Sequence, residues 1–271
     1  MRDHRKAVVL IPHYNDPEGL QKTIASFSEN EPCDVLVVDD GSIAPIDENK
    51  IQELFKATGE VFFLYLEQNS GIETALNKGL DWIKENDYQF IARLDCGDIN
   101  MPQRIHKQLE FMENNADIQL LGTWAEAIDV NGNPLYQLHL PAAHEDIEKK
   151  MFLNNMFIHP TVMFRKEALD VIKEYPYDYP AAEDYAFFFK FVRNFKTANL
   201  PEVLVRFEIN TAGGISSTRR STQLQTRIKI IKENFKFGYY PIMGITRASI
   251  LLFIPRNIVE SLKKRILWKG K

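Results

Sequence analysis

The feature that most constrains this chain is the alternation, in its first half, of short apolar runs with stretches typical of helices. Four runs are rich in β-branched and aromatic residues and span 7–11, 34–40, 61–66 and 90–95. Between them, Asp16-Pro17 offers an N-cap with proline at the first helical position, and Pro102 is expected to open a helix over 103–114 in the same way. This rhythm is typical of βαβ units and predicts an α/β fold with a mostly parallel central sheet covered by helices.

The second half of the chain has a different hydrophobic pattern. Alternating apolar residues over 119–129 end at an Asn-Gly turn signal at 131–132, which predicts a hairpin or an extended loop. Further strands are expected at 161–164 and 198–207, and a helix at 185–195. This part is expected to form the acceptor side of an enzyme.

Charge divides the chain into an acidic body and a basic tail. Residues 219–271 contain 13 Lys and Arg against 2 Asp and Glu, a net charge of +11, and the −4 of the whole chain leaves −15 for residues 1–218. Because nucleic acids are held mostly by clusters of Lys and Arg, the acidic body argues against a nucleic-acid ligand. The 2 cysteines show no metal-ligand spacing, and the apolar run after Lys6 is too short for a signal peptide, so we expect a cytoplasmic protein.

A polar motif follows each of the four apolar runs. In open α/β sheets, ligands bind beyond the carboxyl ends of the strands, so these motifs are the first candidates for a site. Neither phosphate-binding glycine loop, GxGxxG or GxxxxGK(S/T), is present, so a phosphate ligand needs another source of positive charge. The four motifs are Pro12-His13-Tyr14-Asn15, Asp39-Asp40-Gly41-Ser42, Gln68-Asn69-Ser70-Gly71 and Asp95-Cys96-Gly97-Asp98.

Asp95 and Asp98 supply that positive charge if they hold Mg²⁺ or Mn²⁺. Both ions prefer carboxylate oxygen and commonly bridge a protein to a diphosphate. The alternative is structural, with one aspartate capping the helix near Pro102 and the other facing water. The residues alone leave both interpretations open.

Seven segments, taken in order, resemble glycosyltransferase family 2. They are VVLIPHYND, VLVVDDGS, NSGIETALNKGL, IARLDCGDINMPQRIHKQLEFM, IHPTVMFRKEAL, AEDYAFFFKF and VRFEINTAGGISSTRRSTQLQ, and they cover roughly residues 7–225. The resemblance is closest to bacterial enzymes that assemble lipopolysaccharide, capsule or other surface glycans. It implies the GT-A fold, with a catalytic domain over 1–217 made of a nucleotide-binding half (1–115) and an acceptor-binding half (116–217). A basic amphipathic helical extension over 218–271 is expected to follow.

The resemblance also implies an activity and a set of site residues. The chain would be an inverting transferase that moves a sugar from a nucleotide-sugar, expected to be a UDP-sugar, to a hydroxyl of a saccharide or lipid-linked acceptor. Asp184 matches the catalytic base, with Glu183 beside it, and Asp40 would accept a hydrogen bond from the base of the nucleotide. The expected nucleotide-binding residues are Pro12, Tyr14, Asn15, Asp39, Asp40, Asn69, Arg93 and Asp95.

One position departs from the family pattern. Alignment on Pro102 places Gly97 where the second aspartate of the family's DxD metal motif stands. Either Asp98 takes over the contact with Mn²⁺ or Mg²⁺, or diphosphate and water hold the ion, or metal dependence is weak. We expect Asp95 and Asp98 to be the two acidic groups at the diphosphate.

Some of these residues have plainer interpretations. Glu183 and Asp184 favour a helix N-terminus through their charge alone, and Asp39 and Asp40 are suited to capping a turn. Cations beside the departing diphosphate would stabilise the charge that develops there, but each also suits a structural ion pair or a solvated surface. The candidate cations are Arg93, Arg104, His159, Arg219 and Arg220.

The basic tail predicts a membrane contact. Residues 235–254 are apolar and aromatic but are interrupted by two cations and a proline, so a spanning helix is not expected. Residues 258–268 combine apolar and basic side chains, as in segments that lie on an anionic membrane surface, here the inner face of the cytoplasmic membrane. The alternative is a helical extension packed on the body or on a second subunit.

Two other classes of protein remain open. A sugar nucleotidyltransferase would share the sheet and acidic residues, but the first strand here lacks a following Gly- and Arg/Lys-rich phosphate loop. A non-catalytic protein that binds nucleotide-sugars is compatible with Gly97. Release of nucleoside diphosphate from the donor separates a glycosyltransferase from both.

Overall fold

The computed structural model describes residues 6–209 and 219–254. Its first half contains β1 (Ala7–His13), α1 (Pro17–Ala25), β2 (Cys33–Asp39), α2 (Glu48–Leu54), β3 (Val61–Tyr65), α3 (Ile72–Lys84), β4 (Phe90–Arg93), β5 (Ile99–Asn100) and α4 (Arg104–Asn114). Its second half contains β6 (Ile118–Ile128), β7 (Pro134–Leu138), α5 (His144–Met151), η1 (His159–Thr161), β8 (Met163–Arg165), η2 (Lys166–Ala168), α6 (Leu169–Ile172), α7 (Glu183–Asn194), β9 (Lys196–Glu208), α9 (Arg220–Glu233) and α10 (Tyr239–Phe253).

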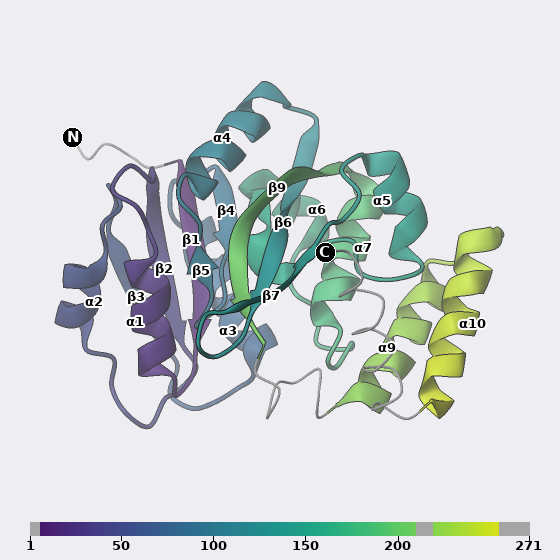
Figure 1. Cartoon of the computed structure of the whole chain (residues 1–271), viewed down its shortest axis with the longest axis horizontal. Helices are drawn as coiled ribbons and strands as arrows, with labels where there is room; N and C mark the ends of the chain where they lie inside the picture. Colours follow the sequence, from purple (N-terminus) through teal and green to yellow (C-terminus); the bar gives the residue numbers. More distant parts are fainter. Residues whose placement is uncertain (1–5, 210–218, 255–271) are drawn as a thin grey trace.

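Nine strands form one sheet within the described ranges (Figure 1). The path runs β3-β2-β1-β4-β8-β6-β9-β5, with β7 paired to β6. The strands β1, β2, β3 and β4 pair in parallel, whereas β8 pairs antiparallel with both β4 and β6. The predicted α/β architecture is therefore confirmed, with a parallel first half and a mixed second half.

Both faces of the sheet are buried, which explains the unbroken apolar runs of β1 and β2. Val8 and Leu10 of β1 pack in a cluster with residues of α3 and α7. Val9 and Ile11 face the other way, into a cluster with residues of α1 and α4. Because successive side chains of a strand point to opposite faces, a strand covered on both faces is apolar at every position.

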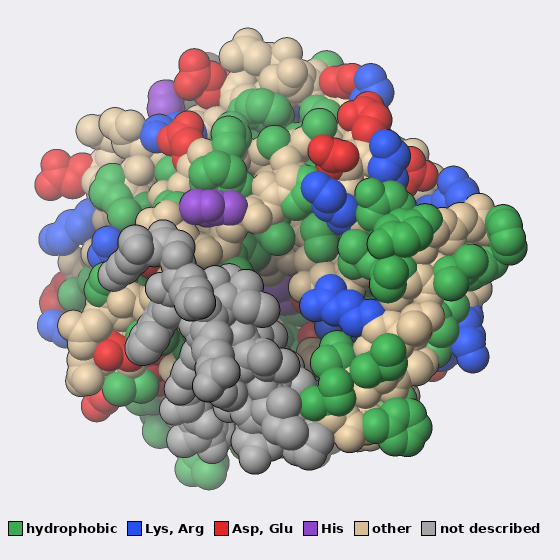
Figure 2. Space-filling model, turned by 45° about the vertical axis from the view of Figure 1, so that its right-hand side comes forward, with side chains coloured by type: hydrophobic (Ala, Val, Ile, Leu, Met, Phe, Trp, Pro, Cys, Tyr) green, Lys and Arg blue, Asp and Glu red, His purple; other side chains and the backbone are tan. Residues whose placement is uncertain are grey.

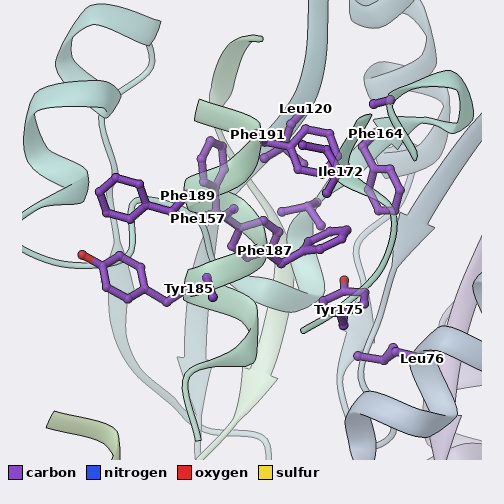
Figure 3. Close-up of a cluster of buried hydrophobic side chains, with 14 of the residues drawn as sticks. Leu76, Leu120, Phe157, Phe164, Ile172, Tyr175, Tyr185, Phe187, Phe189 and Phe191 are labelled. Carbon is purple, nitrogen blue, oxygen red and sulfur yellow. The ribbon is translucent and has the colours of Figure 1, made fainter. Parts of the chain in front are cut away.

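An aromatic core surrounds the start of α7 (Figure 3). Tyr175 and Phe187 stack with ring centroids 3.9 Å apart, and Phe164 meets Phe187 edge to face at 5.8 Å. These residues come from β8, the loop after α6, and α7. Their packing fixes the first turn of α7, which carries Glu183 and Asp184.

The predicted element boundaries are mostly confirmed, with two corrections. Asp16 caps α1 by accepting a hydrogen bond from the Gly19 N–H at 2.9 Å, as the Asp-Pro pair predicts. Pro102 does not open α4 in the same manner, because Gln103 stands between Pro102 and the first turn in a left-handed conformation with φ of 63°. The strand expected at 161–164 begins later, at Met163, since its first residues form a 3₁₀ turn.

The C-terminal helices α9 and α10 lie at the opposite end of the molecule from α2 (Figure 1). They pack against each other, and Gly244 of α10 approaches the Phe152 carbonyl so closely that a Cβ there would lie 2.0 Å from that oxygen. Across 6–209 and 219–254, no helix has the length and apolar character needed to cross a bilayer. The segment 258–268, expected at a membrane surface, lies outside the described residues.

Candidate functional site

The loop after β2 is tied to the loop before α3 by Asp40. Its two carboxylate oxygens accept hydrogen bonds from the backbone N–H groups of Ser70 at 2.8 Å and Gly71 at 2.9 Å. Asp40 is 4% exposed, so its clearest role is to hold two rim motifs together. Asn69, in the second of these motifs, is exposed and remains a candidate nucleotide contact.

A second network joins the loop after β1 to the loop after β2. Asp39 accepts from Ser42 N–H at 3.1 Å and contacts His13 Nδ1 at 2.7 Å. Asn15, with φ of 51°, accepts from the Ile43 N–H at 2.9 Å. These side chains shape the rim, and Tyr14, 47% exposed, is the aromatic ring of this group that is open to a nucleotide base. Pro12, half-buried in β1, lies beneath them.

Arg93 and Asp95 form an ion pair at the end of β4. Arg93 is fully buried, and its Nη1 also donates to the carbonyl oxygens of Leu10 at 3.0 Å and Leu94 at 2.7 Å. The side chain of Asp95 is 36% exposed. Partial burial opposes its ionisation, but the positive charge of Arg93 holds the pKa of Asp95 below its ordinary value. Arg93 therefore presents Asp95 to the rim as a carboxylate.

His159 extends this network toward α7. Its Nε2 accepts from Arg93 Nε at 3.3 Å and lies 3.0 Å from the Tyr175 hydroxyl. Because an arginine nitrogen can only donate, Nε2 must carry no proton. Burial and the charge of Arg93 lower the pKa of His159 to about 3. A neutral His159 is therefore a positioning group for Arg93 and not a cation for phosphate.

The acidic turn after Asp95 places Asp98 inside the protein. Asp98 is 5% exposed, and its Oδ1 accepts from the Glu208 N–H of β9 at 3.0 Å. Burial and the charge of Asp95 raise the pKa of Asp98 well above its ordinary value. Gly97 between them has φ of +94°, a conformation that favours glycine. The turn thus accounts for Gly97 at the position of the usual aspartate.

Glu183 and Asp184 are adjacent acidic residues in the first turn of α7. Asp184 accepts from its neighbour Tyr185 N–H at 2.7 Å and from Asn155 Nδ2 at 3.0 Å. Burial raises the pKa of Asp184, while these hydrogen bonds and the charge of Arg227 oppose the rise. Burial and the charge of Asp184 raise the pKa of Glu183 to about 8. Near neutral pH Glu183 is therefore held in its protonated form.

This arrangement predicts a pH-dependent effect of replacing Glu183. Since the folded state holds the Glu183 proton up to about pH 8 and an ordinary glutamate loses it near 4.5, stability falls as pH rises between these values. We expect Glu183→Gln to unfold about 2–4 °C higher than the parent at pH 8.5, the shift that roughly 1 kcal/mol gives in a chain of this size. Thermal unfolding at pH 5 and pH 8.5 checks this, and an equal difference at both values would contradict it.

Three of the expected cations lie elsewhere. Arg104 is fully buried, and its Nη2 donates to the Arg93 carbonyl at 2.6 Å, so it is a structural arginine and does not reach a phosphate. Arg220 donates to the carbonyls of Leu251 and Ile254 and so caps the end of α10. Arg219 is exposed at the start of α9.

The structure adds two residues near Asp184 that sequence patterns did not reveal. Asn155 stands 29 positions before Asp184, and Arg227 lies on α9, with its Cζ 5.4 Å from the Tyr185 ring centroid. Neither belongs to a motif with a recognisable spacing. Asn155 lies in the turn after α5 and Arg227 lies on α9, so only tertiary packing brings both to the acidic pair.

Comparison with known proteins gives the family. The model of glycosyl transferase family 2 matches residues 8–173, more than half of the chain. The chain belongs to glycosyltransferase family 2. It is 30% identical to an uncharacterized glycosyltransferase of Methanocaldococcus jannaschii over 74% of this chain and 70% of that protein.

Two further relatives resemble this glycosyltransferase over most of their length. The amylovoran biosynthesis glycosyltransferase AmsE of Erwinia amylovora is 28% identical over 88% of this chain and 92% of that protein. A UDP-Gal:alpha-D-GlcNAc-diphosphoundecaprenol beta-1,3-galactosyltransferase of Escherichia coli is 29% identical over 98% of both.

Solved structures show the same fold. S. aureus TarS 1–349 in complex with UDP-GlcNAc matches with a TM-score of 0.61 at 19% identity, over 91% of this chain and 70% of that one. A mannosyltransferase of Pyrobaculum calidifontis in complex with GDP-Man and Mn²⁺ matches with a TM-score of 0.61 at 14% identity, over 92% and 70%. This chain spans 41% of the longer TarS chain. The fold is GT-A, as the sequence resemblance implied.

Proposed function

We propose that this family 2 enzyme transfers a sugar, with inversion, from a UDP-sugar to a hydroxyl of a lipid-linked acceptor in the synthesis of a bacterial surface glycan. The observation that carries the proposal is a chain of contacts that joins Asp95 to α7, the helix that carries Asp184. Asp95, two residues after β4, pairs with Arg93, which donates to His159. His159 lies 3.0 Å from the hydroxyl of Tyr175, whose ring stacks on Phe187 of α7. The charge of Asp95 also contributes to the raised pKa of Asp184. One carboxylate at the donor diphosphate and a second, partly buried one at the acceptor suit a single displacement.

In this mechanism Asp184 removes the proton of the acceptor hydroxyl while the bond to the nucleoside diphosphate breaks. Asn155 and the Tyr185 N–H orient its carboxylate, and a protonated Glu183 adds no negative charge beside it. The relatives that act in amylovoran biosynthesis and on a diphosphoundecaprenol acceptor support the choice of a lipid-linked saccharide.

A divalent metal fits the site only with ligands from the substrate. Within the described ranges, no cluster of three or more His, Cys, Asp or Glu side chains gathers to hold an ion. Asp95 supplies carboxylate oxygens at the rim, whereas Asp98 is buried behind it, and a donor diphosphate and water would complete the set for Mn²⁺ or Mg²⁺. Such an ion would neutralise the charge of the departing diphosphate. The solved complex of a mannosyltransferase of this fold with GDP-Man and Mn²⁺ supports the proposal of such an ion.

Donor turnover tests the proposed function. A panel of nucleotide-sugars is incubated with the protein and Mn²⁺, with a chelator in a parallel arm, and nucleoside diphosphate is measured. We expect release from one or a few donors, dependent on the metal. Release of pyrophosphate would indicate a nucleotidyltransferase, and binding of a donor without any release would indicate a non-catalytic protein.

We also propose a peripheral membrane contact at the ends of α10. Phe237 is 93% exposed and Phe253 87% exposed, and the helix between them exposes further apolar side chains. Inserting a phenylalanine into a bilayer contributes about 1.5–3 kcal/mol, or roughly 10- to 100-fold in affinity. Phe237→Ser and Phe253→Ser should each reduce flotation with phosphatidylglycerol vesicles by that amount, and salt should weaken binding by the parent.

A matched control exists on the other side of the molecule. Ile43, 91% exposed in the loop between β2 and α2, offers a similar apolar group far from α10. Ile43→Ser should leave flotation unchanged. Equal flotation of all three variants and the parent would reject a contact through α10.

A further inference from the structure

The turn after α5, residues 153–155, is contacted by three helices in succession. Asn155 donates to Asp184 of α7 at 3.0 Å, and Asn154 Oδ1 accepts from Arg227 Nη2 of α9. The carbonyl of Leu153 accepts from Arg247 Nη1 of α10 at 3.4 Å. One short turn therefore contacts both guanidinium groups and the proposed catalytic base.

These two guanidinium groups have one described carboxylate whose charge acts on them, Asp184, and it acts on Arg227. Neither Arg227 nor Arg247 forms an ion pair with a described carboxylate. Arg227 is half-buried, and burial lowers its pKa; the charges of Tyr185 and Asp184 oppose that fall, and the charge of Arg247 adds to it. Two neighbouring cations repel each other, so an anion bound by both is favoured.

The surroundings of the pair suit a phosphate attached to a lipid. Arg227 and Arg247 line a small cavity whose other walls are mainly apolar, including Leu153, Leu224 and Leu251. On the face of the molecule that carries α9 and α10, Lys and Arg side chains border a hollow and apolar groups lie beyond them (Figure 2). Guanidinium groups bind phosphate oxygens in pairs, and apolar walls strengthen that attraction.

We propose that Arg227 and Arg247 bind the diphosphate of a lipid-linked acceptor and so deliver its sugar to Asp184. The inference rests on the proposed function, because it takes the acceptor to be a lipid-linked saccharide. The lipid would leave along α10, where Ile250 and Phe253 follow Arg247 at three-residue steps and are 53% and 87% exposed. The diphosphate then lies between the reacting sugar and the membrane.

Binding of farnesyl diphosphate tests this pair directly. The probe is titrated by calorimetry into the full chain with saturating UDP, which keeps it out of the donor site. We expect Arg227→Gln and Arg247→Gln each to weaken binding about 10-fold, the loss for one hydrogen bond to a charged group. Lys232→Gln removes the same charge from an exposed position of α9 and should leave binding unchanged.

Each alternative gives a different result. If both arginine variants bind farnesyl diphosphate as tightly as the parent, the proposal is overturned. If kcat also falls while that affinity is unchanged, the arginines only position Asp184. Loss of phosphatidylglycerol vesicle binding alone would assign the pair to membrane headgroups and also overturn it. Loss of inorganic diphosphate binding in the same proportion as farnesyl diphosphate supports recognition of the phosphate itself.

Two controls separate misfolding and failure of the proposed function from failure of this inference. Arg247 is exposed, so Arg247→Gln should retain the parent's circular dichroism and unfolding temperature. Release of nucleoside diphosphate from the donor, measured without acceptor, reports the proposed function independently of farnesyl diphosphate. A chain that binds the probe through both arginines but turns over no donor would retain this site and lose the proposed function.

Discussion

Replacing Asp184 with asparagine is expected to reduce sugar transfer about 10²- to 10⁴-fold, the contribution of a positioned general base. Asparagine keeps the shape of the side chain and an oxygen for the Tyr185 N–H, so the first turn of α7 should persist. Donor binding should be nearly unchanged, because the proposed donor site lies at the ends of β1, β2 and β4, away from Asp184. The measurement is transfer rate under saturating donor together with the donor Kd from calorimetry.

The pH dependence of the transfer rate gives a second, independent test of Asp184 as the general base. Burial raises the pKa of Asp184, so transfer by the parent should fall with decreasing pH earlier than an exposed aspartate would allow. Asp170→Asn, an exposed change on α6, serves as the control and should leave rate and profile as in the parent. Normal transfer by the Asp184→Asn variant would remove Asp184 from the mechanism.

Replacing Asp95 with asparagine is expected to damage both stability and turnover. Arg93 is fully buried and loses its carboxylate partner, which costs about 3–5 kcal/mol when both members of a pair are buried. Because the side chain of Asp95 is 36% exposed, water replaces part of the lost interaction and we expect about half of that cost. Donor turnover should fall about 10²- to 10³-fold, as for other groups that stabilise developing charge.

A double-mutant cycle separates the two effects of Asp95. In an Arg93→Gln background the lost ion pair is already absent, so Asp95→Asn should cost much less stability there. The fall in turnover should persist if Asp95 acts on the diphosphate or its metal. Glu18→Gln, an exposed change near the start of α1, provides the control. Retention of metal-dependent turnover by Asp95→Asn would refute its role.

The fold followed from local patterns that tertiary contacts reinforce. The apolar runs of β1 and β2, the Asp16 cap of α1 and the turn signal before β7 each agree with the structure because burial on both faces and turn chemistry impose strict requirements on residue type. The first residue of α4 was not predicted from the sequence, because the residue types do not indicate that Gln103 adopts a left-handed conformation.

The candidate site, like the fold, has features that the sequence predicts and features that only tertiary contacts determine. The four rim motifs were visible in the sequence, because strand ends of a parallel sheet meet at one edge and each motif directly follows an apolar run. The sequence did not show which carboxylates of these motifs are free to contact a ligand. Asp40 is committed to two backbone N–H groups and Asp98 is buried beneath the rim, whereas Asp95 is presented by Arg93.

What the sequence by itself determined is therefore the GT-A class, the family and the ends of the strands at which a donor would bind. Only the tertiary structure decided that Arg104 is structural, that His159 is neutral, and that Arg227 reaches the acidic pair on α7. The physical reason is that hydrophobic period and turn chemistry are local properties of a chain. The pKa and accessibility of a polar side chain depend instead on neighbours that packing brings from distant segments.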